Sequence, residues 1–158
     1  MSSSEVIEKI KEALGDIIES IEEGKGVVHV FVPVDKIVEA ARKLKELGFD
    51  HIKDVTAIDY PKENVIKIIY HASSYGNVEL SKYIVGLGYS IPRDTERVPS
   101  LYSVWTTADF QEREVYEAFG IVFEGHPDLR PLLLSPPVAE LKPLRKDFVV
   151  KEETIFRK

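Results

Sequence analysis

Apolar residues recur at helical spacing from position 6 to position 21, with Glu and Lys between them. This pattern predicts an amphipathic helix with one buried face. Ser2 and Glu5 have the spacing of a capping box at its start, and Gly24 and Gly26 suit its end. The apolar positions are Val6, Ile10, Ala13, Leu14, Ile17, Ile18 and Ile21.

A second helical stripe follows Pro33, a residue that is favoured at the start of a helix. It spans positions 34–47, and Gly48 is its expected C-terminal cap. Between the two helices, "VVHVFV" (27–32) is short and rich in β-branched residues, which predicts a strand that is apolar on both faces. The second stripe consists of Val34, Ile37, Val38, Ala41, Leu44 and Leu47.

The middle of the chain has the pattern of strands. "HIKDVTAIDY" (51–60) and "VIKIIYHASS" (65–74) are separated by Pro-Lys-Glu-Asn (61–64), which predicts a β-hairpin. "VELSKYIVGLGYS" (78–90) is a third strand candidate, although its two internal glycines weaken it. "IPRDTERVPS" (91–100) contains two prolines and four charged residues, and we expect an exposed loop.

A third helix is predicted over 107–119, because Thr106 and Asp109 again have capping-box spacing and Gly120 suits a left-handed stop. The order of elements is helix–strand–helix–strand–strand–strand–helix. It predicts a single α+β domain over 1–125, with a mixed or antiparallel sheet and helices mainly on one face.

The remaining segment, 126–158, has a different composition. Its first eighteen residues contain five prolines, a density that neither a helix nor a central strand tolerates. We therefore predict an extended, proline-rich C-terminal arm. Its apolar side chains must be buried on its own domain or on a partner, and we expect partner contacts at Leu129, Leu132, Leu133, Leu134 and Phe148. Leu141 and Leu144 are the other large apolar residues of this segment.

Composition excludes several functions. The 158 residues include no cysteine, which rules out disulfides, thiolate metal sites and cysteine-ligated iron–sulfur clusters within the chain. The net charge of −6 argues against a general nucleic-acid surface and against direct binding to anionic lipid. The early charges at the N-terminus and the lack of a long apolar run lead us to expect a cytoplasmic protein. Abundant Glu and Lys favour a thermophilic source.

The third helix also carries candidate chemistry. One hypothesis is a stand-alone metal-dependent hydrolase, with Glu114 and Glu117 as a carboxylate pair and His126 and Asp128 as ligands or a proton relay. However, the sequence contains no His-Glu-x-x-His, no Glu-x-x-His and no phosphate-binding glycine loop. Two other interpretations are a solvated charged face and charges that are paired between subunits.

The C-terminal third resembles one family closely. "VPSLYSVW", "EREVYEAFGIVFEGHPDLR" and "PLRKDF" are similar to the 30-kilodalton subunit of respiratory complex I, a family that includes subunits of membrane-bound energy-converting hydrogenases and ferredoxin-linked complexes. The chain departs from complex I members at Glu117, where they usually have Asp, and at Pro131, where they usually have Arg or Lys. Because of these departures, two kinds of parent complex remain as alternatives: an NADH:quinone oxidoreductase, and a hydrogenase-type or other ferredoxin-linked complex. The matching or partner-binding residues are Glu112, Arg113, Glu114, Tyr116, Glu117, Phe119, Gly120, Phe123, Glu124, Gly125, His126, Pro127, Asp128, Leu129, Arg130, Leu144, Arg145, Lys146, Asp147 and Phe148.

The resemblance implies a non-catalytic subunit of the peripheral, cytoplasmic arm of a membrane-bound redox complex. It implies no catalytic, cofactor-binding or metal-binding residue in this chain. Its partners are then a large subunit, 49-kilodalton-like or hydrogenase-large-like, and a small iron–sulfur subunit. Those partners hold the iron–sulfur clusters and the NiFe or quinone site, and the chain meets the membrane only through the complex.

Overall fold

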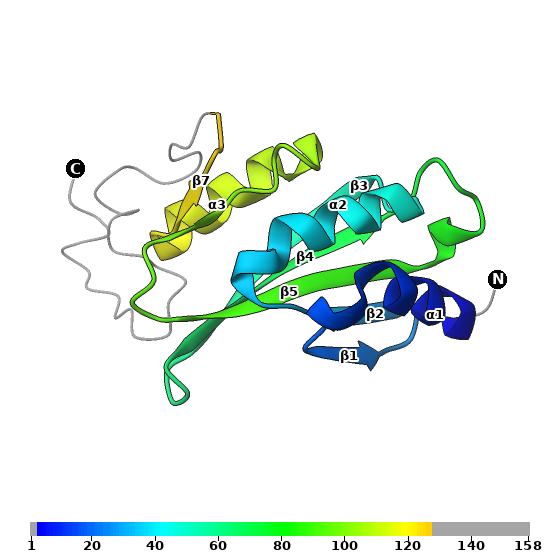
Figure 1. The fold of residues 1–158 in the computed structure, drawn as a ribbon. Helices are drawn as coiled ribbons and strands as arrows, with labels where there is room; N and C mark the ends of the chain where they lie inside the picture. Colours follow the sequence, from blue (N-terminus) through cyan, green and yellow to red (C-terminus); the bar gives the residue numbers. More distant parts are fainter. Residues whose placement is uncertain (1–2, 128–158) are drawn as a thin grey trace.

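A layer of helices covers one face of a five-stranded sheet in the computed structural model, which describes residues 3–127 (Figure 1). A second sheet of two short strands lies beside α3. This arrangement confirms the predicted α+β class with helices on one face. The elements are α1 Ser3–Leu14, η1 Gly15–Ile17, β1 Ser20–Glu23, β2 Val27–Phe31, η2 Val34–Lys36, α2 Ile37–Leu47, β3 His51–Tyr60, β4 Val65–Ser73, η3 Leu80–Lys82, β5 Ile84–Pro92, β6 Arg97–Pro99, η4 Thr106–Ala108, α3 Asp109–Phe119 and β7 Val122–Glu124.

The large sheet is mixed, which is one of the two predicted alternatives, a mixed or an antiparallel sheet. Its strand order is β1-β2-β5-β4-β3, with β2 parallel to β5 and every other pair antiparallel. The predicted hairpin is β3 and β4, and Asn64 in its turn has a positive φ of 58°. The chain passes from β2 through α2 to β3 at the other edge of the sheet. β2 therefore pairs in parallel with β5, a strand far from it in the sequence.

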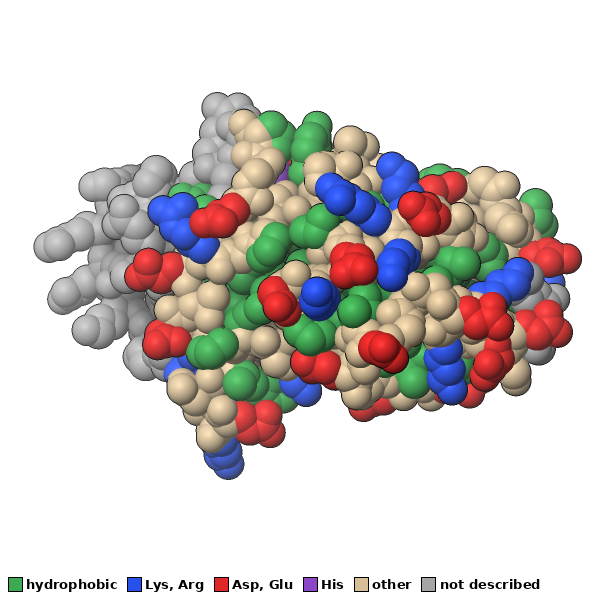
Figure 2. Space-filling model, viewed as in Figure 1, with side chains coloured by type: hydrophobic (Ala, Val, Ile, Leu, Met, Phe, Trp, Pro, Cys, Tyr) green, Lys and Arg blue, Asp and Glu red, His purple; other side chains and the backbone are tan. Residues whose placement is uncertain are grey.

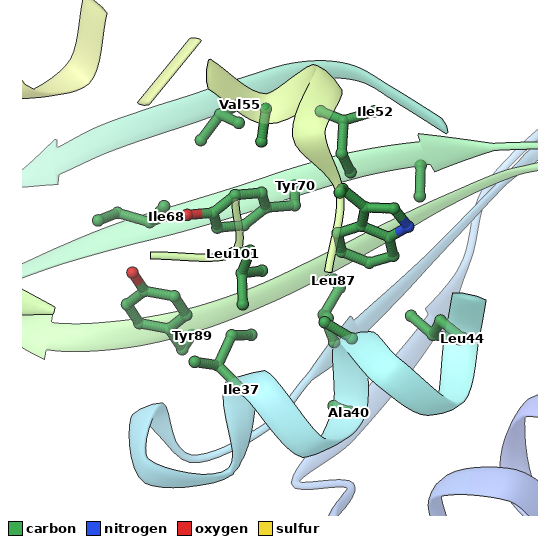
Figure 3. Packing of buried hydrophobic residues seen from close by; sticks show 14 of the residues in the cluster. Ile37, Ala40, Leu44, Ile52, Val55, Ile68, Tyr70, Leu87, Tyr89 and Leu101 are labelled. Atoms are coloured by element: carbon green, nitrogen blue, oxygen red, sulfur yellow. The ribbon is translucent and has the colours of Figure 1, made fainter. Parts of the chain in front are cut away.

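The hydrophobic core lies between α2 and the sheet (Figure 3). Alternate residues of β4 and β5 point towards the helix layer, because successive side chains of a strand face opposite sides. Tyr70 and Leu87 are fully buried there, opposite Ile37 and Leu44 of the predicted stripe. Burying one such side chain contributes roughly 1.5–3 kcal/mol to the free energy of unfolding.

The N-terminal helix is shorter than predicted. It ends at Leu14, and Gly15 has a left-handed φ of 57°, which breaks the helical path. Of the apolar residues that follow, Ile17 belongs to η1, Ile18 lies between η1 and β1, and Ile21 belongs to β1, where it lies opposite Val30 of β2. The prediction of a helix to position 21 was therefore wrong, and β1 was missed because three isoleucines fit either element. The proposed cap residue Ser2 lies outside the described residues.

The prediction of an exposed loop over 91–100 was partly wrong. Its first two residues end β5, and Arg97–Pro99 forms β6, which pairs in parallel with β7. Val98 and Ser100 are buried as a result. This pairing joins strands more than twenty residues apart, so local turn signals gave no indication of it. Conversely, the strand predicted from position 78 begins only at Ile84.

The start of α3 also differs from the prediction. A 3-10 turn, η4, precedes the helix, and neither element has a side-chain cap among the described residues. Thr107 Oγ1 instead accepts a hydrogen bond from Ile52 N (2.9 Å), and Trp105 Nε1 donates to Phe49 O (2.8 Å). These contacts fasten the helix entry to the start of β3. The predicted stop at Gly120 is confirmed, with φ 74° and a bond from its N–H to Tyr116 O.

The two glycines of β5 make room for aromatic rings on the face of the sheet opposite the helices. A Cβ at Gly86 would lie 2.5 Å from His29 Cδ2, and a Cβ at Gly88 would lie 2.9 Å from Phe31 Cε1. Rings that cross over a strand glycine fill the space that its missing side chain leaves. The glycines that weakened the strand prediction therefore serve cross-strand packing.

Candidate functional site

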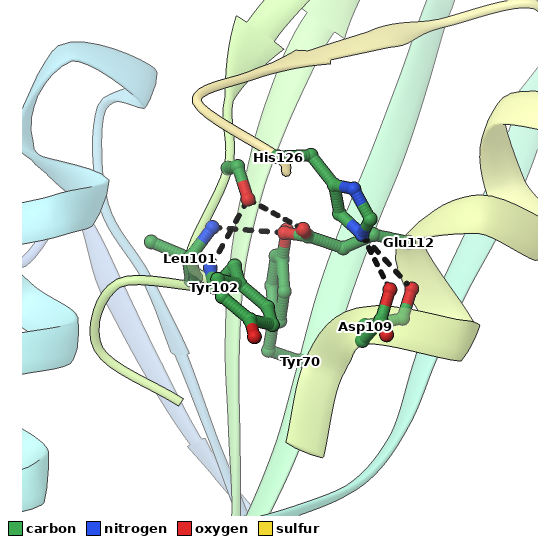
Figure 4. Close-up of polar contacts among 7 residues, drawn as sticks. Tyr70, Leu101, Tyr102, Asp109, Glu112 and His126 are labelled. Atoms are coloured by element: carbon green, nitrogen blue, oxygen red, sulfur yellow. Dashed lines mark hydrogen bonds and ion pairs between the residues drawn. The ribbon is translucent and has the colours of Figure 1, made fainter. Parts of the chain in front are cut away.

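Glu112 of α3 lies at the centre of a buried polar cluster (Figure 4). Its side chain has no solvent exposure, and its carboxylate accepts three hydrogen bonds. Tyr70 Oη and Ser100 Oγ each donate at 2.6 Å, and Leu101 N donates at 2.8 Å. The donors come from β4 and from the segment after β6, so one carboxylate joins α3 to two other parts of the fold.

The electrostatics of this cluster follow from its burial. Burial raises the pKa of Glu112, while the three hydrogen bonds and the nearby His126 oppose that rise. Burial and the neighbouring Glu112 charge hold the pKa values of Tyr70 and Tyr89 well above the usual tyrosine range. Within residues 3–127, the buried hydroxyl of Tyr89 has no hydrogen-bond partner. Both phenols therefore remain neutral, and that of Tyr70 donates to the carboxylate.

His126 fastens the end of the described chain to α3. Its imidazole is fully buried, with Nε2 2.8 Å from Asp109 Oδ1 and 3.3 Å from Asp109 O. The contact with Oδ1 lacks the alignment of a good hydrogen bond, and it is an ion pair only in the protonated form of the imidazole. The His126 ring also lies 5.7 Å from the ring of Tyr102 (Figure 4). The first residue of the predicted arm therefore packs on the first turn of the helix.

The remaining charges of the helix lie in different environments. Arg113 and Glu117 are buried, whereas Glu114 is exposed. The Arg113 guanidinium lies 5.6 Å from the centre of the Phe110 ring. Glu114 and Glu117 therefore do not form a carboxylate pair in one pocket, as the hydrolase hypothesis requires.

The other described signature residues lie along the end of α3, in β7 and just after it. Phe119 and Phe123 are buried, and Gly120 and Gly125 have positive φ angles of 74° and 94°. Glu124 is exposed and lies 3.7 Å from a guanidinium nitrogen of Arg97. Tyr116 is half-buried and Pro127 is exposed. Outside the described residues lie Asp128, Leu129, Arg130, Pro131, Leu144, Arg145, Lys146, Asp147 and Phe148, so the arm from 126 to 158 and its contacts stay a prediction.

Several members of the cluster were not identified from the sequence. Tyr70 had a signal, because alternation places it on the buried face of β4 and a buried phenol requires a partner. Asp109 was assigned to a helix cap, but it faces His126 instead. Ser100 and Tyr102 lie in the family-like stretch "VPSLYSVW", but their contacts with Glu112 and His126 could not be predicted, because their positions depend on the pairing of β6 with β7.

No group of three or more His, Asp or Glu side chains in the described part of the chain is arranged to hold a metal ion. None of the helices between residues 3 and 127 is both long and apolar enough to cross a membrane. On the side shown in Figure 2, acidic and basic side chains are interspersed with hydrophobic ones. The two signs of charge are therefore mixed on this side and form no extended patch of one sign.

The fold and the cluster define a class of protein: an α+β domain in which the charges of one helix hold that helix and the following segment on the sheet. The chain belongs to the family described as the 30-kilodalton subunit of respiratory-chain NADH dehydrogenase, whose model matches residues 30–154. The resemblance seen in the sequence is thereby confirmed.

Curated relatives are subunits of oxidoreductase complexes. The chain is 37% identical over 122 residues to an F420H2 dehydrogenase subunit of Methanosarcina mazei, covering 77% of this chain and 75% of the relative. It is also 37% identical over 134 residues to an NADH-quinone oxidoreductase subunit of Moorella thermoacetica, covering 84% and 87%. An NADH-quinone oxidoreductase subunit of Thermus thermophilus is 36% identical over 143 residues, covering 85% of this chain and 68% of the relative.

Two solved structures share the fold. One belongs to the membrane-bound sulfane sulfur reductase, an archaeal respiratory membrane complex, with a TM-score of 0.81 and 32% identity over 92% of this chain and 85% of that one. The other is the trypsin-resistant fragment (1–134) of Nqo5, with a TM-score of 0.67 and 32% identity over 82% of this chain and all of that one.

Proposed function

We propose that this chain is a non-catalytic structural and assembly subunit of the peripheral, cytoplasmic arm of a membrane-bound respiratory redox complex. The complex is of the NADH:quinone oxidoreductase type or the energy-converting hydrogenase type. The chain binds the large subunit and the small iron–sulfur subunit, and those partners hold the cofactors. Family membership and the relatives' names as parts of such complexes support this proposal.

The observation that carries the proposal is the internal use of Glu112. A catalytic carboxylate must reach its substrate, but Glu112 is unexposed and accepts three hydrogen bonds from its own domain. Its partners are a phenol, a hydroxyl and a backbone amide. Among the described residues, Glu112 is the most deeply buried acidic residue of this chain, and its contacts position α3.

The outer face of α3 is the part of the signature that is available to a partner. Phe110 is 59% exposed, and Glu114, one turn later on the same face, is exposed as well. A large apolar side chain beside a charge is a combination found at the edge of protein interfaces. We assign this face, together with the arm from 126 to 158, to partner binding.

The test is to place an affinity tag on this chain in its native source and to purify it from detergent-solubilised membranes. We expect a 49-kilodalton-like or hydrogenase-like large subunit and a small iron–sulfur subunit to co-purify in equal amounts. Recovery of the chain alone, or only with further copies of itself, would contradict the proposal. In that case a homo-oligomeric scaffold would be the better description.

A double variant separates assembly from catalysis. We expect Glu114→Ala combined with Phe110→Ala to reduce the amount of assembled complex, while the domain keeps its unfolding midpoint. The turnover of each assembled complex should be unchanged, because the chain supplies no reacting group. Normal assembly with lost turnover would contradict a non-catalytic role.

A further inference from the structure

Two large apolar side chains protrude from one short loop between β4 and β5. Of the described residues, Tyr75 is 71% exposed and Val78 is 82% exposed. Both belong to residues 74–81, which we name the 74–81 loop. Figure 1 shows it in green near the N-terminus, at the opposite end of the molecule from β7. The loop is therefore a separate surface from the end of α3 and the start of the arm.

The first half of the loop is fixed by Asp50. Its carboxylate accepts hydrogen bonds from Tyr75 N (2.9 Å) and Gly76 N (3.2 Å), and these bonds lower the pKa of Asp50. The Tyr75 ring stacks on the His51 ring, with the ring centres 4.1 Å apart. The phenol is thereby held in one orientation while most of its surface faces solvent.

The second half is fixed by Asn77 and by a buried leucine. Asn77 Oδ1 accepts hydrogen bonds from Glu79 N (3.0 Å) and Leu80 N (3.3 Å). Ser81 Oγ donates to Val78 O (2.6 Å), and Leu80 is buried in the core. The backbone around Val78 is therefore held by the loop itself, which leaves its side chain projecting from a defined position.

This combination has the properties of an interface hot spot. A rigid tyrosine supplies a large contact area and one hydroxyl donor, and it loses little conformational entropy on binding. Single exposed apolar residues are common, but two of the three most exposed in the described chain lie three residues apart on one fixed loop. The pair forms a small apolar projection whose complement is a concave pocket.

Charge indicates which kind of partner fits. Asp50 and Glu79 are exposed beside the projection, and the whole chain has a net charge of −6. These carboxylates oppose insertion into an anionic membrane. They would also face one another in a symmetric contact between two copies. A different protein with an apolar pocket and a basic or neutral rim fits best.

We propose that the 74–81 loop inserts Tyr75 and Val78 into an apolar pocket of another protein of the complex. This inference rests on the proposed function, since it requires a complex. It adds a second contact surface, at the other end of the molecule from β7 and the start of the arm. The pocket must offer an acceptor for the Tyr75 hydroxyl.

The test replaces Tyr75 with the photo-crosslinking residue p-benzoylphenylalanine in the tagged full-length chain. After irradiation of purified complex, we expect one dominant product that joins this chain to a different subunit. The matched control carries the same group at Lys62, which is exposed in the β3–β4 turn. It should not give that product.

The outcomes distinguish the two proposals. If the complex is recovered but Tyr75 gives no product, or cross-links to lipid or to a second copy, the loop inference is overturned and the proposed function stands. If the chain is recovered alone, the proposed function fails and the loop inference fails with it.

A paired variant gives an independent measure. We expect Tyr75→Ser with Val78→Ser to lower recovery of the complex roughly tenfold or more, because hot-spot side chains dominate binding. The unfolding midpoint of the isolated chain should not change, since both side chains are exposed. Tyr75→Phe with Val78→Ile keeps the apolar projection and removes only the hydroxyl, so recovery should fall between that of the unchanged chain and that of the serine pair. Equal recovery for both pairs would overturn the inference.

Discussion

Tyr70 Oη donates a 2.6 Å hydrogen bond to Glu112 Oε2 in the interior of the domain, where neither side chain has solvent exposure. Tyr70 belongs to β4 and Glu112 to α3, so the bond joins the sheet to the helix that carries the family signature. Hydrogen bonds to a charged acceptor are shorter and about twice as strong as neutral ones. The most deeply buried charge of the signature therefore acts in packing.

The first prediction concerns removal of this carboxylate. Glu112→Ala leaves three buried donors without their acceptor, and one unsatisfied buried group costs about 1–3 kcal/mol. We expect the free energy of unfolding to fall by roughly 3 kcal/mol or more. Urea unfolding of the full chain, followed by far-UV circular dichroism, measures this change.

Two matched variants make that result specific. Glu112→Gln keeps one acceptor oxygen and the side-chain volume, so we expect a loss of roughly 1–2 kcal/mol. Glu114→Ala removes an exposed carboxylate from the same helix and should change stability by about 0.5 kcal/mol or less. Equal losses for Glu112→Ala and Glu114→Ala would show that the buried cluster does not stabilise the fold.

The second prediction concerns pH. Because burial raises the pKa of Glu112 above the ordinary glutamate value, the folded chain holds this proton more tightly than the unfolded chain. The contribution of protonated Glu112 is fully present below the unfolded-state pKa. It is lost as the pH rises through the folded-state pKa, with a slope of at most about 1.4 kcal/mol per pH unit.

The difference between the chain and its Glu112→Gln variant isolates this effect, because all other groups titrate in both. We expect the stability advantage of glutamate over glutamine to be largest near pH 4 and to shrink towards neutral pH. Urea unfolding at a series of pH values measures it. An advantage that grows with pH would mean that the hydrogen bonds outweigh burial and lower the pKa instead.

The third prediction concerns Gly88. A Cβ there would lie 2.9 Å from Phe31 Cε1 and 3.1 Å from the backbone oxygen of Ile68, which cannot move away easily. We expect Gly88→Ala to lower the free energy of unfolding by about 1–3 kcal/mol. In a double-mutant cycle with Phe31→Ala, the two losses should be less than additive, because removal of the ring relieves part of the clash. Full additivity would contradict the packing of Phe31 on this glycine.

Much of the fold could be predicted from local pattern. The stripe of α2, the hairpin turn and the left-handed Gly120 follow from rules that depend only on neighbouring residues. The misassigned segments depend on distant ones. The local pattern around Ile21 fits a helix, and its strand conformation depends on pairing with β2. In the same way, β6 depends on pairing with β7.

In the candidate site too, local features could be predicted and long-range contacts could not. At 100° per residue, helical spacing alone distributes the charges of α3 over several faces, which argues against one shared pocket. It could not indicate which face is buried, because Tyr70 and Ser100 approach from segments 42 and 12 positions away. Two nearby acids of the signature lie in opposite environments: Glu112 is a core residue, and Glu114 is at the surface.

The last prediction concerns His126, which holds the segment after β7 on α3. His126→Ala removes a fully buried imidazole and its 2.8 Å contact with Asp109 Oδ1. The small sheet should open more often, because β7 ends only two residues before His126. We expect the Val122 amide, which donates to Glu96 O at 2.8 Å, to exchange with deuterium roughly tenfold faster or more. The amide of Val32, which donates to Gly88 O in the large sheet, should be unaffected.

Asp109→Asn is the matched variant for this prediction, since it keeps the shape of the partner and removes its charge. If the charge of Asp109 contributes, deuterium exchange of the Val122 amide should also be faster in Asp109→Asn, but by a smaller factor than in His126→Ala. If only the packing of the imidazole on Tyr102 matters, His126→Phe should restore slow exchange. Unchanged Val122 exchange in His126→Ala would show that β6 and β7 hold together without the histidine.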